Sequence, residues 1–113
     1  MMISHDEKKI LSEALSNGID LQKGIDIQAL TILIWESIAL MPYPIESSFN
    51  IIGNSSVINI TNEKKEVVLI VNIDKKRIMF KIPKPRYKRS RDDSVAIMFA
   101  AMSIAGIALN TCK

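Results

Sequence analysis

The amino-acid sequence predicts an α+β protein in which helices pack on a four-stranded antiparallel meander, in the order α-α-β-β-β-β-α. Three features predict this architecture: two helical patterns before residue 42, four short β-rich runs between residues 48 and 82, and one long uncharged helical pattern after residue 90. The connections between the β-rich runs are too short for parallel crossovers, so neighbouring strands must be antiparallel. At 113 residues, the chain is expected to form a single domain over residues 1–113.

Two helices are expected before the sheet. The first covers residues 4–17, where Ser4 and Glu7 have the spacing of a capping box, and a glycine follows its last residue. The second covers residues 26–41, with Asp26 as its N-cap and a proline directly after it. Apolar side chains cover most of the circumference of this second helix, which is typical of a central or interface helix. The segment between the two helices is expected to be a simple connection.

Residues 66–73 carry the densest β signal in the chain and are expected to form the central strand. Six of these eight residues are aliphatic, and five of the six are β-branched. The other strands are expected over residues 48–52, 57–61 and 77–82, with a turn over residues 53–56 between the first two. The alternation of apolar and polar residues predicts a set of inward-facing side chains: Ile58, Ile60, Ile78, Phe80 and Ile82.

A third helix is expected after Ser90, which has capping-box spacing to an aspartate three residues on. Its residues 95–109 carry no charge, but this stretch is shorter than the roughly 20 residues that span a membrane, so no membrane anchor is expected. Small residues four apart, Ala101 and Ala105, allow another backbone to approach closely. Because the second and third helices carry more apolar surface than one small sheet covers, the sequence predicts a homodimer with Trp35, Ala101 and Ala105 at the interface.

Charge is distributed unevenly along the chain. Residues 75–91, called the basic strip below, hold nine of the fifteen Lys and Arg residues and no Asp or Glu. The strip therefore carries +9 and the rest of the chain −6, within a net charge of +3. Such a strip attracts anionic partners. The residues expected to contact the partner are Lys81, Lys84, Arg86, Tyr87, Lys88, Arg89 and Arg91.

Two alternative explanations of the basic strip stay open at this point. Lysine and arginine on an edge strand protect a sheet from aggregation. A basic segment also pairs with acidic surface, which here is the remainder of the chain or of a second copy.

No catalytic or metal-binding pattern stands out in the sequence. His5 is the only histidine, and no second His or Cys lies at ligand spacing from it. Cys112 is a single thiol near the C-terminus, and the scattered glycines form no phosphate-binding loop. Glu36, Asp74 and Lys76 are residue types that metal-dependent nucleases use, but the expected middle strand lacks the acid that such a site needs. The sequence therefore predicts neither an enzyme nor a cofactor or metal site.

Together these features predict a small non-catalytic binding or adaptor protein that acts through protein–protein contacts, with the basic strip touching an anionic partner. The alternative is a nucleic-acid-binding accessory protein that places the same strip on phosphates, with Tyr87 stacking on a base. A membrane-peripheral or tail-anchored role ranks third. The single cysteine and an N-terminus without signal-peptide features favour the cytoplasm.

Overall fold

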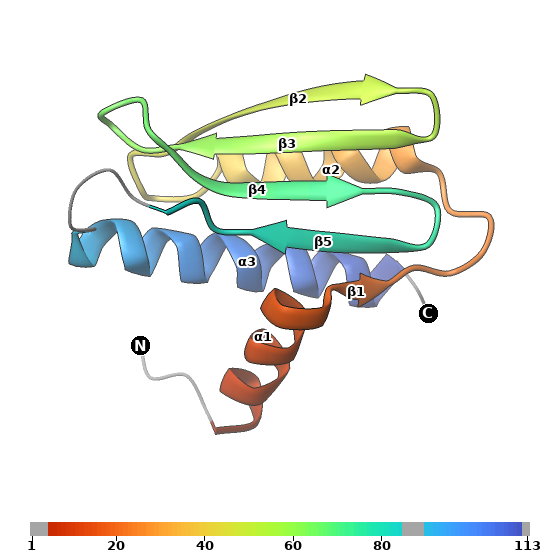
Figure 1. The fold of residues 1–113 in the computed structure, drawn as a ribbon, viewed down its shortest axis with the longest axis horizontal. Helices are drawn as coiled ribbons and strands as arrows, with labels where there is room; N and C mark the ends of the chain where they lie inside the picture. The colour runs from red at the N-terminus through yellow and green to blue at the C-terminus, as the bar shows by residue number, and fades with distance from the viewer. Residues whose placement is uncertain (1–4, 85–89, 112–113) are drawn as a thin grey trace.

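The computed structural model describes residues 5–84 and 90–111, and these residues form an α+β fold with three helices and one five-stranded antiparallel sheet (Figure 1). The elements in chain order are α1 (His5–Asn17), β1 (Ile19–Asp20), α2 (Ile27–Ala39), β2 (Glu46–Ile52), β3 (Ser55–Thr61), β4 (Val67–Ile73), β5 (Arg77–Lys81) and α3 (Arg91–Thr111). The α+β class is confirmed, and the Ser4 cap expected for the first helix lies outside the described residues.

The strands lie in the order β1-β5-β4-β3-β2, and every neighbouring pair is antiparallel. The expected meander is present as β2 to β5, and the expected central strand, β4, lies in the middle of the sheet. The turn between β2 and β3 is tighter than the sequence predicts, because pairing continues until Ile52 lies opposite Ser55. Gly53 has φ +59°, a conformation that lets the chain reverse within two residues.

The prediction of four strands is wrong by one, because the segment between α1 and α2 contains β1. This strand pairs with β5 and places Ile19 opposite Ile78 and Asp20 opposite Arg77. Gly18 allows the approach: its φ is +78°, and a Cβ atom there would overlap the carbonyl oxygen of Ile78. Arg77 Nη2 lies 3.1 Å from Asp20 Oδ1 across the pair. A two-residue strand is too short to show periodicity in the sequence.

The caps predicted for α2 and α3 are present. Asp26 Oδ1 accepts a hydrogen bond from the backbone N–H of Ala29 at 3.1 Å, and Ser90 Oγ accepts one from that of Asp93 at 3.1 Å. The Asp93 carboxylate instead accepts a hydrogen bond from Asn62 Nδ2 at 3.0 Å. The side-chain cap of Ser90 therefore forms, while Asp93 ties the start of α3 to the loop between β3 and β4.

Helices α2 and α3 cover one face of the sheet, and α1 packs against β5 and α3 (Figure 1). The core between the two layers is aliphatic, and Ile34 of α2, Leu69 of β4 and Ile104 of α3 are fully buried. The inward-facing residues predicted in β3 and β5 are buried except for Ile82, which is 43% exposed. This residue misses the core because β5 ends at Lys81.

The uncharged part of α3 packs into this core. The helix is 21 residues long, so residues 91–110 are long and apolar enough, by length and composition alone, to cross a membrane. In the fold its small residues pack inside the chain. The buried alanines of α3 are Ala96, Ala100, Ala101, Ala105 and Ala108.

Candidate binding surface

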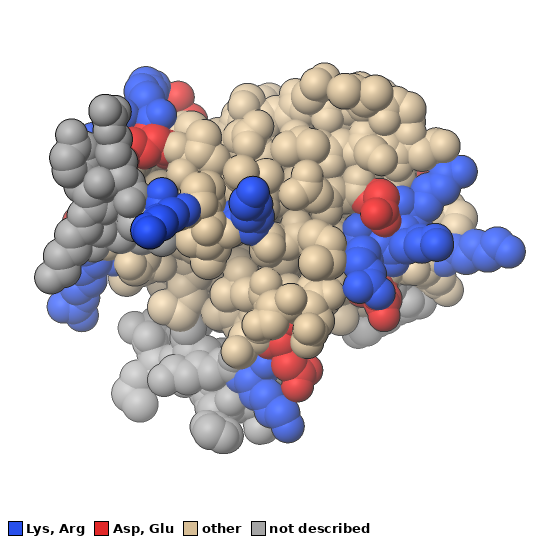
Figure 2. All heavy atoms as spheres, viewed as in Figure 1, with Lys and Arg blue, Asp and Glu red and all other residues tan. Residues whose placement is uncertain are grey.

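The face of the sheet opposite α2 and α3 carries no helix within the described residues, and it is called the open face below (Figure 1). Strand alternation places Val57, Ile70 and Met79 at its centre, on adjacent strands, and all three are half-buried. Asn72 lies between Val57 and Met79 in the register, and further hydroxyl and amide side chains flank the centre: Ser48, Asn50, Asn59 and Thr61. Figure 2 shows that this side of the molecule is largely uncharged, with most of its basic side chains toward the two ends.

Strand β5 brings part of the basic strip to the open face. Arg77 and Lys81 alternate with the buried Ile78 and Phe80, so the two cations point away from the helices. Lys81 lies opposite Ile70 of β4, next to the apolar centre of the open face. β1 pairs with only the first two residues of β5, so the remainder of β5 is a sheet edge. Lys81 on this edge therefore also fits the alternative explanation, protection of the sheet from aggregation.

Most of the described cations of the strip make no ion pair with another described residue. Within the described residues, only Arg77 of the basic strip makes an ion pair, with Asp20. The side chains without one are those of Lys75, Lys76, Lys81, Lys84 and Arg91. Within the described residues, the Arg77–Asp20 pair is therefore the one ion pair between the basic strip and the chain's own acidic groups. The predicted contact residues Lys81, Lys84 and Arg91 are exposed, whereas Arg86, Tyr87, Lys88 and Arg89 lie outside the described residues.

A pocket of 780 Å³ lies at one end of the sheet, where the turn between β4 and β5 meets the loop between β1 and α2. The backbone N–H of Leu21 donates to the carbonyl of Lys76 at 2.7 Å and holds the two segments together. The residues that line the pocket are Asp20, Leu21, Lys23, Gly24, Ile25, Lys75 and Lys76. Sequence reasoning missed this pocket, because it joins Lys23 to two lysines that lie some fifty positions further along the chain.

The turn that presents these lysines is fixed by one carboxylate. Asp74 Oδ1 accepts hydrogen bonds from the backbone N–H groups of Lys76 at 2.8 Å and Arg77 at 2.9 Å. The bonds from the Arg77 and Lys76 amides, with a smaller contribution from the two positive side chains, hold the pKa of Asp74 below its ordinary value of 3.8. Asp74 is therefore ionised at neutral pH and engaged in its own turn.

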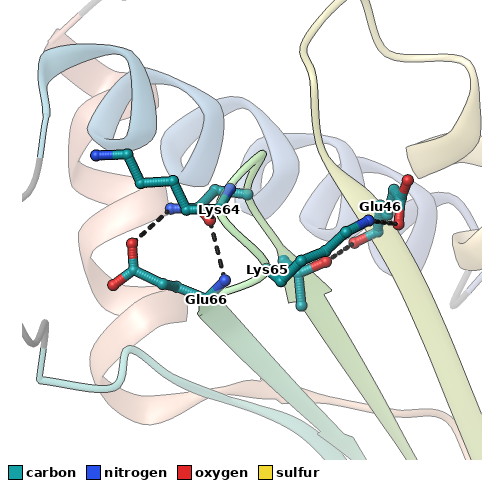
Figure 3. Close-up of polar contacts among 6 residues, drawn as sticks. Glu46, Lys64, Lys65 and Glu66 are labelled. Carbon is teal, nitrogen blue, oxygen red and sulfur yellow. Dashed lines mark hydrogen bonds and ion pairs between the residues drawn. The ribbon is translucent and has the colours of Figure 1, made fainter.

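The opposite end of the sheet is organised by Asn62, which is only 6% exposed. Its Oδ1 accepts from the backbone N–H groups of Lys64 at 2.9 Å and Glu66 at 3.0 Å, and this shapes the loop between β3 and β4. Figure 3 shows this loop, with Lys65 reaching Glu46 of β2 at 3.0 Å. Glu46 and Glu66 at this end thus contact Lys65 and Asn62, which lie outside the basic strip.

The residues predicted for a homodimer interface lie in different environments. Trp35 is 37% exposed, donates from Nε1 to the carbonyl of Ser47 at 3.1 Å and packs edge-on against Phe49 at 5.6 Å between ring centres. Ala101 and Ala105 are only 1% and 6% exposed, because they belong to the chain's own core. In this fold the two alanines offer no surface to a second chain, whereas Trp35 does.

The described part of the chain contains no group of three or more His, Cys, Asp or Glu side chains that could hold a metal ion. No protein-family model, curated protein or solved structure matches the chain.

Proposed function

We propose that the protein is a small non-catalytic binding protein whose open face receives an acidic protein partner, with the cations of the basic strip as charged contacts. The observation that supports this most is the arrangement of the open face: an apolar centre of Val57, Ile70 and Met79 lies beside Lys81, which makes no ion pair with another described residue. An apolar centre with a polar and charged rim is the usual anatomy of a protein interface.

Charge gives this surface its selectivity and its association rate. A segment of +9 on a chain of net +3 attracts an acidic partner before contact and raises the association rate at low salt. The half-buried Val57, Ile70 and Met79 then supply a contribution that salt does not screen.

Nucleic acid is the second candidate, and the position of the described aromatic side chains, which do not include Tyr87, disfavours it. Proteins that bind single-stranded nucleic acid on a sheet stack the bases on aromatic rings. The described aromatic residues lie away from the open face, as the Trp35–Phe49 pair, the stacked pair of Tyr43 and Phe99, and the buried Phe80. The phosphates of a nucleic acid bound here would contact cations, but none of these aromatic rings is placed to stack on its bases.

The proposed active form is a homodimer. Apolar side chains remain on the surface beside the β2 edge of the sheet, including Trp35 of α2 and Phe49 of β2, each of which is 37% exposed. A second chain would cover part of this surface and double the number of open faces in one particle.

The binding proposal is tested with three labelled probes: a peptide that mixes glutamate with leucine, a peptide with glutamate but no leucine, and single-stranded DNA of similar charge. Fluorescence anisotropy is measured at low and physiological salt. We expect the mixed peptide to bind most tightly and to keep part of its affinity at physiological salt, because the apolar centre is not screened. Equal or tighter binding of DNA, with a steep salt dependence, would favour the second candidate.

Matched variants locate the site. Lys81→Ser with Lys84→Ser removes two exposed charges of the basic strip, including the one beside Ile70, and Lys9→Ser with Lys64→Ser removes two exposed lysines outside the basic strip. The first pair should weaken binding of both acidic peptides several-fold, while the second pair should leave it nearly unchanged. Equal effects of the two pairs would show that only net charge matters, and the proposed site would be wrong.

A further inference from the structure

The outer edge of β2 is the longest strand edge that the described residues leave uncovered. β2 is the last strand in the sheet order and has seven residues, whereas the strand at the opposite border, β1, has two. Edge strands of stable monomers are usually protected by lysine, proline, a bulge or short length. β2 contains no Lys, Arg or Pro, and its one charged residue, Glu46, is held by Lys65 of the same chain.

The direction of the backbone groups along this edge follows from the hairpin. A two-residue turn makes Ile52 and Ser55 a hydrogen-bonded pair, so alternate residues from Ile52 back to Glu46 direct their N–H and C=O groups toward β3. Two contacts agree with this: Thr61 Oγ1 of β3 donates to the carbonyl of Glu46 at 3.4 Å, whereas the carbonyl of Ser47 accepts from Trp35 Nε1 on α2. The residues whose backbone groups point outward are therefore Ser47, Phe49 and Ile51.

These three positions are self-complementary. When a second copy lies antiparallel and is centred on Phe49, this residue pairs with its own equivalent, and Ser47 of each copy lies opposite Ile51 of the other. Every outward N–H then meets an outward C=O, as in a hydrogen-bonded antiparallel ladder. The Ser47 carbonyl keeps a second lone pair for this bond while it accepts from Trp35.

Side chains also fit this register. Phe49 lies on the helix-covered face next to Trp35, and each of the two residues is 37% exposed, so the two-fold axis would bring two such aromatic pairs together at the seam. Aromatic cross-strand pairs stabilise antiparallel strands. Glu46 falls opposite Ile52 of the other copy, so no like charges face each other.

We propose that two copies of this chain join at the β2 edge, centred on Phe49, into one continuous antiparallel sheet with Trp35 of each copy packed over the seam. The inference deepens the homodimer of the proposed function and does not depend on the partner of the basic strip. The seam lies at the border of the sheet remote from β5, so Lys75, Lys76 and Lys81 of each copy stay accessible in the dimer.

The test places charge on the two-fold axis. Phe49→Lys puts two ammonium groups directly opposite each other, as Phe49→Glu does with two carboxylates, and each variant alone should run as a single chain of about 12.7 kDa in sedimentation equilibrium. The wild-type chain should have twice that mass. An equimolar mixture of the two variants should recover the dimeric mass, because opposite charges then meet at the seam. Circular dichroism checks that each variant is folded.

Leu40→Lys is the matched control, because it adds the same charge to an exposed apolar residue that lies at the end of α2 and not in β2. It should leave the dimer intact. A monomeric wild-type chain would overturn the inference, as would a Phe49→Lys variant that stays dimeric. Dissociation by Leu40→Lys but not by Phe49→Lys would place the dimer on the helices and overturn the β2 seam. Binding of the glutamate–leucine peptide, measured on the same variants, reports separately on the open face.

Discussion

Across β3, β4 and β5, side chains alternate between the face that α2 and α3 cover and the open face. On the covered face, Ile58, Leu69 and Ile78 are fully buried, whereas on the open face Ile70 and its neighbours keep part of their surface in water. Aliphatic residues therefore have different roles on the two faces of the sheet. On the covered face they hold the fold together, and on the open face they leave apolar surface that a partner can cover.

The polar groups differ between the faces in the same way. On the covered face, the hydroxyls of Thr31 and Ser56 are buried and bonded to each other at 2.6 Å. On the open face, the amide and hydroxyl groups of Asn50 and Ser48 are exposed. Polar groups under the helices must find partners within the chain, while those on the open face can exchange water for a ligand.

Truncation of a covered aliphatic side chain should have the largest effect on stability. Ile58→Ala removes fully buried methyl and methylene groups and leaves a cavity between β3 and α2, so the free energy of unfolding should fall by about 2–5 kcal/mol. Val57→Ala, the adjacent change on the open face, should cost less than about 1.5 kcal/mol, because Val57 is only half-buried. Urea unfolding of both variants measures the difference. Similar losses would contradict the distinction between the two faces.

A buried hydroxyl should give the next largest effect. Thr31 Oγ1 donates to the carbonyl of Ile27 at 2.7 Å and contacts Ser56 Oγ at 2.6 Å. Thr31→Val leaves the buried Ser56 hydroxyl without its partner and should lower the free energy of unfolding by about 1–3 kcal/mol. Adding Ser56→Ala to this variant should cost little more or recover part of the loss. A double-mutant cycle with no coupling between the two sites would contradict this interpretation.

Elements with a long local pattern could be predicted from the sequence. The N-cap of α2 at Asp26 and the central position of β4 follow from capping chemistry and from dense β-branched residues. Local patterns also identify which residues share a face, as Ile58 and Ile60 do. They do not say what lies against that face.

The features that the sequence did not predict all depend on contacts between distant segments. β1 has two residues and exists because Gly18 lets it approach β5. The pocket depends on the meeting of Lys23 with the turn at Lys75. The pattern at Ala101 correctly indicated close packing, but a sequence cannot tell whether the close neighbour is the same chain or a second one.

A change at the centre of the open face should affect binding more than stability. Ile70→Thr keeps a β-branched residue in β4 while making the apolar centre smaller and more polar, so the free energy of unfolding should fall by about 1 kcal/mol or less. Anisotropy should show several-fold weaker binding of the glutamate–leucine peptide and unchanged binding of the peptide without leucine. A loss of more than about 2 kcal/mol in unfolding free energy would mean that Ile70 belongs to the core rather than to a binding surface.

The smallest effect is expected at Asp74, in the turn that ends the open face. Because the Arg77 and Lys76 amides lower the pKa of this carboxyl in the folded state, its charge stabilises the fold at pH values above the ordinary pKa of 3.8. This stabilisation is lost as the pH falls from 3.8 through the lower pKa of the folded state. Asp74→Asn keeps an oxygen that can accept the two amide hydrogen bonds and removes only the charge. The melting temperature of the wild type should therefore exceed that of Asp74→Asn slightly at neutral pH, and the two should converge in strong acid. Asp74→Ala also removes the acceptor, so it should melt lower than Asp74→Asn throughout. A wild-type advantage that grows on acidification would contradict the direction of the pKa shift.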